Sequence, residues 1–352
     1  MPDIALTNVR VFDGHRLLEP GTVVISGGHI GTETAGADVV DCEGGVLLPG
    51  LIDAHVHLHG PESLDQLASH GVTTALDMAC WPPALVDSLR NARGTTDIRS
   101  AGTPAVAPGS KHSKLPGFPA TAVVAEPDGA KTFVADRVAE GSDYIKVVAE
   151  PPGPDAFDPA TLEALISAAR DHGKLSIAHA AAFGAVVSTA KAGADVLTHV
   201  PLDRPIDDVA AALLKGRTVV PTLTMMAGVA ANVPQLAYRP AELSVTALHR
   251  AGVLILAGTD ANATPGAPAN VPHGSSMHEE LERLVDAGLS TVEALRAATS
   301  APAQVFGLAD RGAIAPGLRA DLVLLDGDPI ADIRATRRIR RIWCEGIEHA
   351  PA

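Results

Sequence analysis

The chain has 352 residues, 46% of them hydrophobic, which is enough for a large α/β barrel with an appendage and argues against disorder. Its net charge of −14 makes a nucleic-acid partner unexpected, and no apolar run reaches the length of a membrane span. Three widely spaced cysteines and the absence of a signal-peptide pattern predict a cytoplasmic protein with reduced thiols.

The two ends of the chain share a β-rich pattern that differs from the middle. Residues 1–48 alternate as hairpin strands in "IALTNVRVFDG", "GTVVISGGHIG" and "ADVVDCEGG", and similar segments return after residue 307. Two or three strands need a covered face to be stable. We therefore expect residues 1–48 and 308–352 to pair into one small β-sandwich domain, with residues 49–307 inserted between them as a second domain.

From residue 50 onward, short apolar runs alternate with amphipathic stretches such as "DPATLEALISAARDHGK" and "RPAELSVTALHRAG". Short, continuous apolar runs are typical of parallel strands buried on both faces. Eight strand–helix repeats predict a (β/α)8 TIM barrel. A doubly wound open sheet is the alternative, but no G-x-G-x-x-G turn follows a strand. The predicted strands are 51–57, 72–78, 98–106, 144–150, 175–180, 195–200, 218–224 and 253–260.

The segment "GLIDAHVHLHG" places histidines at alternate positions after an apolar run. On a strand, residues i and i+2 point to the same face, so the first two imidazoles would project together. In a barrel, catalytic residues lie at the carboxyl ends of strands. Imidazoles and carboxylates are ordinary metal ligands, so the pattern predicts a metal site. The residues at these strand ends are His55, His57, Lys146, His179, His199 and Asp260, whereas His59 is expected to be a loop histidine.

Lys146 stands in the apolar run "DYIKVVAE", where burial disfavours a protonated amine. One interpretation is a strand-end lysine that snorkels to solvent or pairs with a carboxylate. The other is that burial lowers its pKa, so that the neutral amine captures carbon dioxide. The resulting carbamate would be an anionic ligand able to bridge two cations, and this interpretation is favoured.

This arrangement resembles the amidohydrolase superfamily of metal-dependent hydrolases. The shared features are the H-x-H of "PGLIDAHVH", the lysine of "DYIKVV", the histidines of "IAHA" and "LTHV", and the aspartate of "GTD". The tail from "GLSTVEALRAATSAPAQVFGLADRG" to "LVLLDGDP" is similar to the family's passage into its small β-domain. Within the superfamily, the branches of imidazolonepropionase and Xaa-Pro dipeptidases are the most similar in pattern.

The resemblance implies two divalent metals, zinc in the first place, with manganese, cobalt or iron as alternatives. One would be held by His55, His57 and Asp260, and the other by His179 and His199. Carbamylated Lys146 and a hydroxide would bridge them, and Asp260 would act as general base and then general acid. Family members are commonly homo-oligomers, so a homo-oligomer is expected.

Two departures from the family bear on the reaction. Deaminase members carry a glutamate shortly after the fifth-strand histidine and usually lack the fourth-strand lysine, whereas "HAAAFGA" contains no acid. Both points lower the expectation of a deaminase. The loop "AEPPGPDAFDP" after Lys146 also differs from the Gly-rich turn of the related branch, so substrate specificity does not carry over.

Several residues near the predicted barrel mouth are candidates for substrate contacts. Lys111 and His112 in "GSKHSK" could meet a substrate anion, although a solvated basic loop is an equal alternative. Tyr238 and Arg239 in "YRP" could bind a carboxylate, or Arg239 could be a surface residue. His273 in "NVPHGSS" is expected near the mouth.

The function predicted from these residues is cleavage of a C–N bond in a small amide, dipeptide or cyclic amide. Lactone hydrolysis, decarboxylation or isomerisation at the same binuclear site are the alternatives, because the ligand set does not separate them. A non-catalytic binding barrel is less favoured, since it would be expected to have lost a ligand and none is missing. No Ser nucleophile elbow or strand-end cysteine suggests covalent catalysis.

Overall fold

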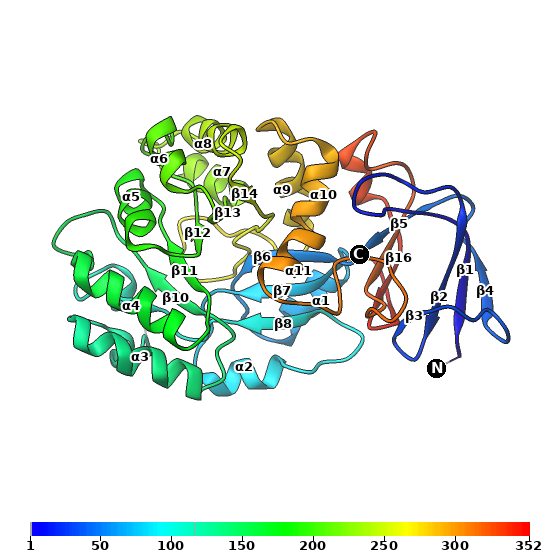
Figure 1. Ribbon diagram of the computed structural model, residues 1–352, viewed down its shortest axis with the longest axis horizontal. Helices are drawn as coiled ribbons and strands as arrows, with labels where there is room; N and C mark the ends of the chain where they lie inside the picture. Colours follow the sequence, from blue (N-terminus) through cyan, green and yellow to red (C-terminus); the bar gives the residue numbers. More distant parts are fainter. Residues whose placement is uncertain (1, 116) are drawn as a thin grey trace.

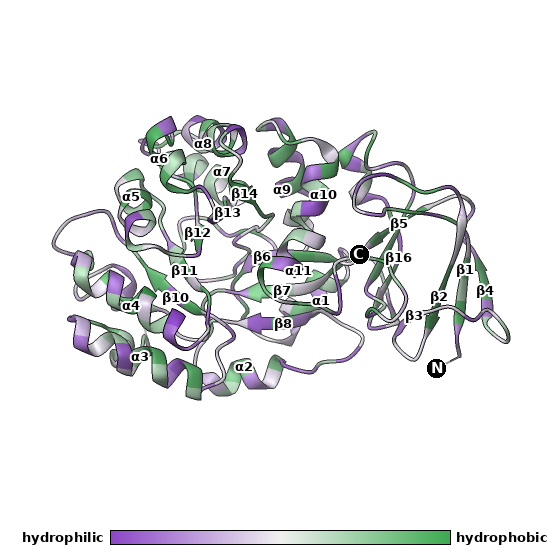
Figure 2. Cartoon of the chain, in the orientation of Figure 1, coloured by the Kyte–Doolittle hydropathy of each residue, from purple (hydrophilic) through white to green (hydrophobic). Residues whose placement is uncertain are grey.

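The computed structural model describes residues 2–115 and 117–352. Figure 1 shows an α/β part, with helices arranged around central strands, next to a β-sheet part that contains both chain ends. Figure 2 shows hydrophobic residues along several central strands, while the surrounding helices carry both hydrophobic and hydrophilic residues. The helices therefore bury one face against the strands, as the amphipathic stretches predict.

The central strands are parallel and form two sheets. The first sheet has the order β6-β7-β8, and the second has the order β14-β13-β12-β11-β10-β9. This is the α/β fold with parallel strands that the alternating pattern predicts. The bounds are β6 Leu51–Val56, β7 Val72–Asp77, β8 Asp97–Ser100, β9 Ala105–Val106, β10 Ile145–Val148, β11 Ser176–His179, β12 Val196–Thr198, β13 Thr218–Val220 and β14 Leu254–Ile255.

The predicted third strand, 98–106, is interrupted in the structure. Its first part, β8, pairs with β7, and its second part, β9, pairs with β10. Between them, Gly102 has a φ of 62°, which is outside the strand region, and Pro104 has no amide hydrogen to donate. The expectation of one continuous strand was wrong, because the chain bends and changes partner here.

The predicted eighth strand is also shorter than expected, since β14 ends at residue 255. The following segment nevertheless lies along β6: the Ala54 amide donates to the Ala257 carbonyl (3.0 Å), and the Asp260 amide donates to the His55 carbonyl (2.8 Å). A Cβ on Gly258 would lie 2.9 Å from the His55 backbone nitrogen, so glycine permits this close approach. Asp260 thus lies five residues beyond the end of β14 and is bonded to β6 through its backbone amide.

Helices follow most of the central strands, and several begin with proline at the first or second helical position, where no amide hydrogen is needed. The Asp158 carboxylate caps α4 by accepting from the Ala160 and Thr161 amides. The helices are α1 Pro61–Ala68, α2 Pro83–Leu89, α3 Pro127–Ala139, α4 Pro159–Asp171, α5 Phe183–Ala192, α6 Asp208–Leu213, α7 Leu223–Asn232, α8 Arg239–Arg250, α9 Ser275–Asp286, α10 Thr291–Ala297 and α11 Ser300–Val305. Short 3-10 helices cover η1 His112–Lys114, η2 Ala120–Ala122 and η3 Ile333–Arg337.

The two chain ends pair with each other in an eight-stranded sheet. Its path is β17-β16-β15-β5-β1-β2-β3, with β4 paired to β1, and β5 joins β15 in the register Leu322↔Pro49. Leu6, Leu47 and Trp343 are buried in its core. The strands are β1 Ile4–Val11, β2 Gly21–Ser26, β3 His29–Gly31, β4 Asp38–Asp41, β5 Val46–Pro49, β15 Leu322–Leu325, β16 Ile339–Cys344 and β17 Ile347–His349.

Among the described residues, no helix has both the length and the apolar character needed to cross a membrane. The three cysteines are buried free thiols, as their number and spacing predict.

Candidate metal centre

The predicted ligands come from the carboxyl-terminal parts of different strands. His55 is near the end of β6, and His179 is the last residue of β11. His57 and His199 lie just beyond the ends of β6 and β12, and Lys146 lies within β10. Because parallel strands end at one edge, the fold brings these side chains to the same region.

Asp260 is the centre of this cluster. Its Oδ1 atom lies 3.0 Å from His57 Nε2 and 3.3 Å from His55 Nε2, and its Oδ2 atom lies 3.7 Å from His199 Nδ1. Potential ligand atoms of His55, His57 and Asp260 all lie within 4.8 Å of one another. These three residues therefore form a compact donor group that could hold one metal ion.

The remaining two histidines lie against this group. His199 Nε2 is 3.0 Å from His179 Nδ1, and their ring centroids are 4.8 Å apart. The His199 ring is also 4.9 Å from the His55 ring. The structure thus brings all four predicted imidazoles together around Asp260.

Lys146 is buried, with 3% of its surface exposed. Its Nζ atom has no hydrogen-bond partner within the described part of the chain. Burial lowers its pKa to about 7, although Asp260 and Asp77 act in the opposite direction. This is the buried environment that the second interpretation of the lysine requires, and the amine is not snorkelling to solvent.

The electrostatics of the histidines suit metal binding. Burial lowers the pKa of His55 and His179 well below the usual value, and it lowers that of His199 to about 4. Burial also acts to lower the pKa of His57, but the hydrogen bond and charge of Asp260 outweigh it and raise the pKa. The three histidines with a lowered pKa stay neutral and keep a lone pair for a cation, and Asp260 adds a carboxylate, so this donor set fits a divalent metal.

The carboxylate of Asp260 carries the charge that such a metal would need. Burial acts to raise its pKa, but His199, His57 and Lys146 outweigh this effect and lower it. His55 Nε2 is buried and makes no hydrogen bond among the described residues. A buried donor atom without a hydrogen-bond partner is unusual in proteins, and coordination to a cation would satisfy it.

Two threonine hydroxyls contact the Nδ1 atoms of His55 and His199. Thr198 Oγ1 lies 2.7 Å from His55 Nδ1, and Thr222 Oγ1 lies 2.5 Å from His199 Nδ1. Sequence reasoning missed both threonines. Thr198 directly precedes a predicted ligand, which is a usable signal, whereas the position of Thr222 depends on tertiary packing.

The loop that carries His112 borders the cluster. The His112 ring is 5.3 Å from the His179 ring, and its Nδ1 is 3.2 Å from Glu150 Oε1. This hydrogen bond lowers the pKa of half-buried Glu150, and the charge of exposed Lys111 contributes. Glu150 was missed from the sequence, although it follows Lys146 at the same sheet edge.

His273 lies next to His57, which follows the first central strand. It is buried, and its Nε2 lies 2.9 Å from the His57 carbonyl oxygen. His59 is exposed, and its Nε2 accepts from the Ala263 amide at 3.0 Å. Its contacts are those of a loop histidine.

Tyr238 and Arg239 have contacts away from the histidines. The Arg283 guanidinium lies 4.9 Å from the centre of the Tyr238 ring, and Arg239 is exposed and paired with Glu242 of its own helix at 2.7 Å. The structure does not bring either side chain into contact with the cluster among the described residues. A carboxylate-binding role for this pair stays a prediction.

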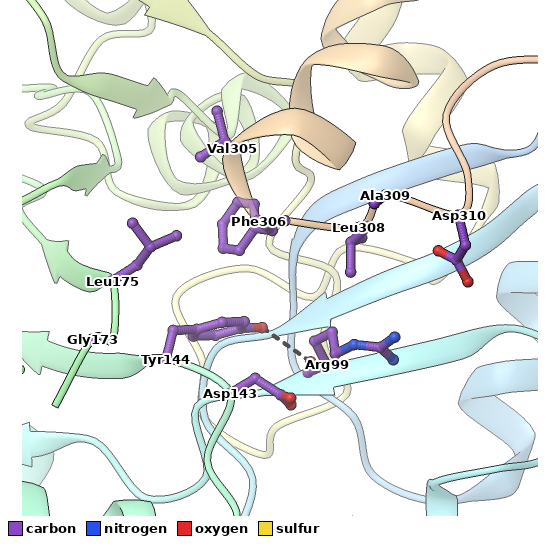
Figure 3. Close-up of a pocket in the computed structure, with 11 residues that line it drawn as sticks. Arg99, Asp143, Tyr144, Gly173, Leu175, Val305, Phe306, Leu308, Ala309 and Asp310 are labelled. Carbon is purple, nitrogen blue, oxygen red and sulfur yellow. Dashed lines mark hydrogen bonds between the residues drawn. The ribbon is translucent and has the colours of Figure 1, made fainter.

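A cavity of about 580 Å³ lies at the other end of the strands (Figure 3). Tyr144 and Leu175, which precede β10 and β11, line it together with Phe306. The single hydroxyl hydrogen of Tyr144 is shared between the Asp77 carbonyl (2.9 Å) and the Arg99 carbonyl (3.0 Å). No predicted site residue lines this cavity, so it is separate from the candidate metal centre.

The sequence of this chain matches a known protein family. The pattern of the amidohydrolase family matches residues 46–347. The chain therefore belongs to the amidohydrolase family.

Similar proteins include adenine deaminases, dipeptidases and prolidases. An adenine deaminase of Methylobacterium sp. (strain 4-46) is 28% identical over 92% of this chain, which spans 55% of that deaminase's length. A Xaa-Pro dipeptidase crystallised with bound methionine has a TM-score of 0.85 at 21% identity, covering 99% of this chain and 100% of the dipeptidase. A prolidase complexed with N-methylphosphonate-L-proline also has a TM-score of 0.85, at 22% identity over 99% of this chain and 100% of the prolidase. The fold of this chain is thus the same as that of these two solved structures.

Proposed function

We propose that this protein is a binuclear metal-dependent hydrolase that cleaves the C–N bond of a small amide, dipeptide or cyclic amide. The observation that carries the proposal is the buried amine of Lys146, which has no hydrogen-bond partner among the described residues and lies close enough to the group of Asp260 and four histidines for the charge of Asp260 to act on it. A structural lysine would be expected to have a partner, whereas a metal-bridging carbamate explains an amine in this position.

The residues divide into two ligand groups. His55, His57 and Asp260 would hold one metal, and His179 and His199 would hold the other. Lys146, as a carbamate formed with carbon dioxide, would bridge them, and zinc is the metal that this donor set favours. When bound, the metals would lower the pKa of a water molecule and polarise the carbonyl of the substrate.

Asp260 would move the proton in the reaction. Its lowered pKa keeps it ionised at neutral pH, so its carboxylate can accept a proton from the attacking water. The same carboxyl group would then give the proton to the leaving nitrogen. His57 and His55, at 3.0 and 3.3 Å from Oδ1, keep this oxygen oriented.

Basic residues near His179 in the fold, and one near His199 in the sequence, support a substrate with a negatively charged group. Lys111 and His112 lie on the side of His179, and Arg204 follows His199 by five residues. The Arg204 guanidinium lies 3.4 Å from the centre of the Phe183 ring, and it forms no ion pair among the described residues. We propose that these groups bind a substrate carboxylate, such as that of a dipeptide or N-acyl amino acid.

Deamination of a heterocyclic amine is the second candidate, because named relatives of similar sequence are adenine deaminases. It also breaks a C–N bond. The segment "HAAAFGA", which begins at His179, contains no acid, and Lys146 lies on the fourth predicted strand, so amide hydrolysis is preferred. Loss of adenine absorbance on incubation with the protein would favour deamination.

We propose further that the parallel strands close into an eight-stranded barrel over residues 49–307. The backbone bonds from residues 54–57 to residues 257–261 and the parallel bridge between Val56 and Ala261 support closure. Residues 1–48 and 308–352 would then be the two parts of a β-sandwich domain, supported by the pairing of β5 with β15.

The test is a metal analysis followed by a substrate screen. Purified protein loaded with zinc would be incubated with N-acyl amino acids, dipeptides, cyclic amides, lactones and adenine. The proposal expects turnover of at least one amide and its loss on chelation. Turnover of lactones alone, or of adenine alone, would replace the proposed reaction.

A further inference from the structure

Glu280 is a fully buried carboxylate on α9 that holds the start of α7. It accepts hydrogen bonds from the Leu223 amide (2.9 Å), the Thr224 amide (2.8 Å) and the Thr224 hydroxyl (2.9 Å). The first amides of a helix have no partner within the helix, and a negative charge is favourable there. Glu280 thus supplies from another helix the cap that the N-cap residue of α7, Thr222, does not provide.

The side chain of Thr222 does not cap α7 but contacts a histidine of the cluster. Its backbone is in the left-handed region, with φ and ψ both at 50°, which is uncommon for a β-branched residue. Its hydroxyl lies 2.5 Å from His199 Nδ1. Glu280 fixes the two residues that follow Thr222, and this fixes the turn that aims the hydroxyl at the imidazole.

Holding Nδ1 determines how His199 presents its other nitrogen. His199 Nε2 faces His179 Nδ1 at 3.0 Å, within the cluster. An imidazole that binds a metal usually donates its other N–H to a partner, which sets its tautomer and its ring orientation. Thr222 is in place to be that partner.

We infer that Glu280 is a positioning residue of the metal centre, acting through the start of α7 and Thr222 on His199. This inference rests on the proposed function, in which His199 binds the second metal. Glu280 itself does not contact the cluster. Its expected effect is therefore on metal retention, with the reaction affected as a consequence.

The experiment measures binding of cobalt and zinc to the metal-free full-length protein. Glu280→Gln keeps the shape of the side chain but places an NH2 group opposite amide donors, and Thr222→Val removes only the hydroxyl. Both variants should bind the second metal 10- to 100-fold more weakly than wild type and keep the first. Their cobalt absorption spectra should change in the same way.

Three further variants separate positioning from general stability. Thr222→Ser keeps the hydroxyl, so it should bind the second metal more tightly than Thr222→Val does, with an affinity near that of wild type. Glu279→Gln, a neighbour on α9 that is paired with Arg283, should bind both metals like wild type. The double variant Glu280→Gln/Thr222→Val should be no weaker in metal binding than Thr222→Val alone, since both changes act on one path.

If Glu280→Gln fails to fold, Thr224→Val provides a milder test, because it removes one of the three bonds to Glu280. This variant should weaken binding of the second metal by a smaller factor than Glu280→Gln does. Wild-type affinity for both metals in Glu280→Gln, or in Thr224→Val where only that variant folds, would overturn the inference. A wild-type protein that binds only one metal, or none, would instead overturn the proposed function.

Discussion

His57 and Asp260 meet at 3.0 Å although 203 positions separate them in the sequence, because the first and last predicted strands are neighbours in the fold. The amide of Asp260 also donates to the carbonyl of His55, so backbone and side chain are both anchored to β6. The candidate site is therefore placed at the junction where the strand array would close. Its geometry depends on the whole fold.

Replacing Asp260 with asparagine tests its role as the proton carrier. The amide keeps an oxygen for a metal but cannot accept a proton, so kcat/KM should fall on the order of a hundredfold or more, while part of the metal is retained. Steady-state kinetics and elemental analysis would measure the two effects. Asp128→Asn, an exposed carboxylate on α3, is the control. Near-normal kcat/KM in Asp260→Asn would remove the proposed acid–base role.

Arg204→Met tests the proposed recognition of a substrate carboxylate. A methionine can still lie on the Phe183 ring but offers no charged hydrogen bonds, so KM for substrates with a free carboxylate should rise about tenfold. Amidated versions of the same substrates should be unaffected. Equal changes for both substrate series would mean that Arg204 acts on the structure and does not bind the carboxylate.

Arg311 joins the segment after α11 to the strand array. Its guanidinium lies 2.7 Å from Asp97 on β8 and 2.9 Å from the Thr74 hydroxyl on β7, and its side chain is only 3% exposed. Removing the guanidinium takes a charged donor from Asp97 and from the Thr74 hydroxyl, while Arg99 stays 3.0 Å from Asp97, so Arg311→Met should lower the free energy of unfolding by about 1–3 kcal/mol. Denaturant unfolding would measure this.

The control for Arg311 is Arg334→Met, which removes an exposed pair with Asp332. Its free energy of unfolding should stay within about 0.5 kcal/mol of wild type. If the two variants are equally stable, the buried pair does not hold the two parts of the chain together.

The lowered pKa of His278, on α9, should make the stability of the protein depend on pH. Burial lowers its pKa to about 3, with Arg337 and His70 contributing. Between pH 6.5 and pH 3, the unfolded chain therefore binds a proton that the folded chain does not bind. The free energy of unfolding should fall as the pH falls through this window, and His278→Leu should make that fall less steep. Parallel curves for variant and wild type would contradict this.

Much of the candidate site could be predicted because its residues follow a simple rule. His55, His179 and His199 are at or next to strand ends, and short apolar runs reveal where such strands end. The position of Asp260 was also predicted, although the strand ends at residue 255 and the aspartate reaches the site through a left-handed turn with φ of 58°. The rule places residues at an edge, but it does not give the path of the chain there.

The supporting residues could not be predicted in the same way. Glu280 and Thr222 are 58 positions apart, and only the packing of α9 against α7 shows that the carboxylate caps the helix that follows Thr222. The break between β8 and β9 depends on where the chain changes partner, which local hydrophobicity does not record. Similarly, "YRP" has the composition of a binding loop, but Arg239 pairs with Glu242 on its own helix.

The most direct test of the proposed binuclear carbamate centre is the metal content of wild type and Lys146 variants, measured together with activity. Wild type should hold about two divalent ions per chain. Lys146→Ala should lose the second ion and most activity, and a small carboxylic acid in solution should restore part of both. Lys146→Arg should not recover either, because a guanidinium stays protonated and cannot capture carbon dioxide. Full activity in Lys146→Arg, or one ion per fully active wild-type chain, would contradict the account.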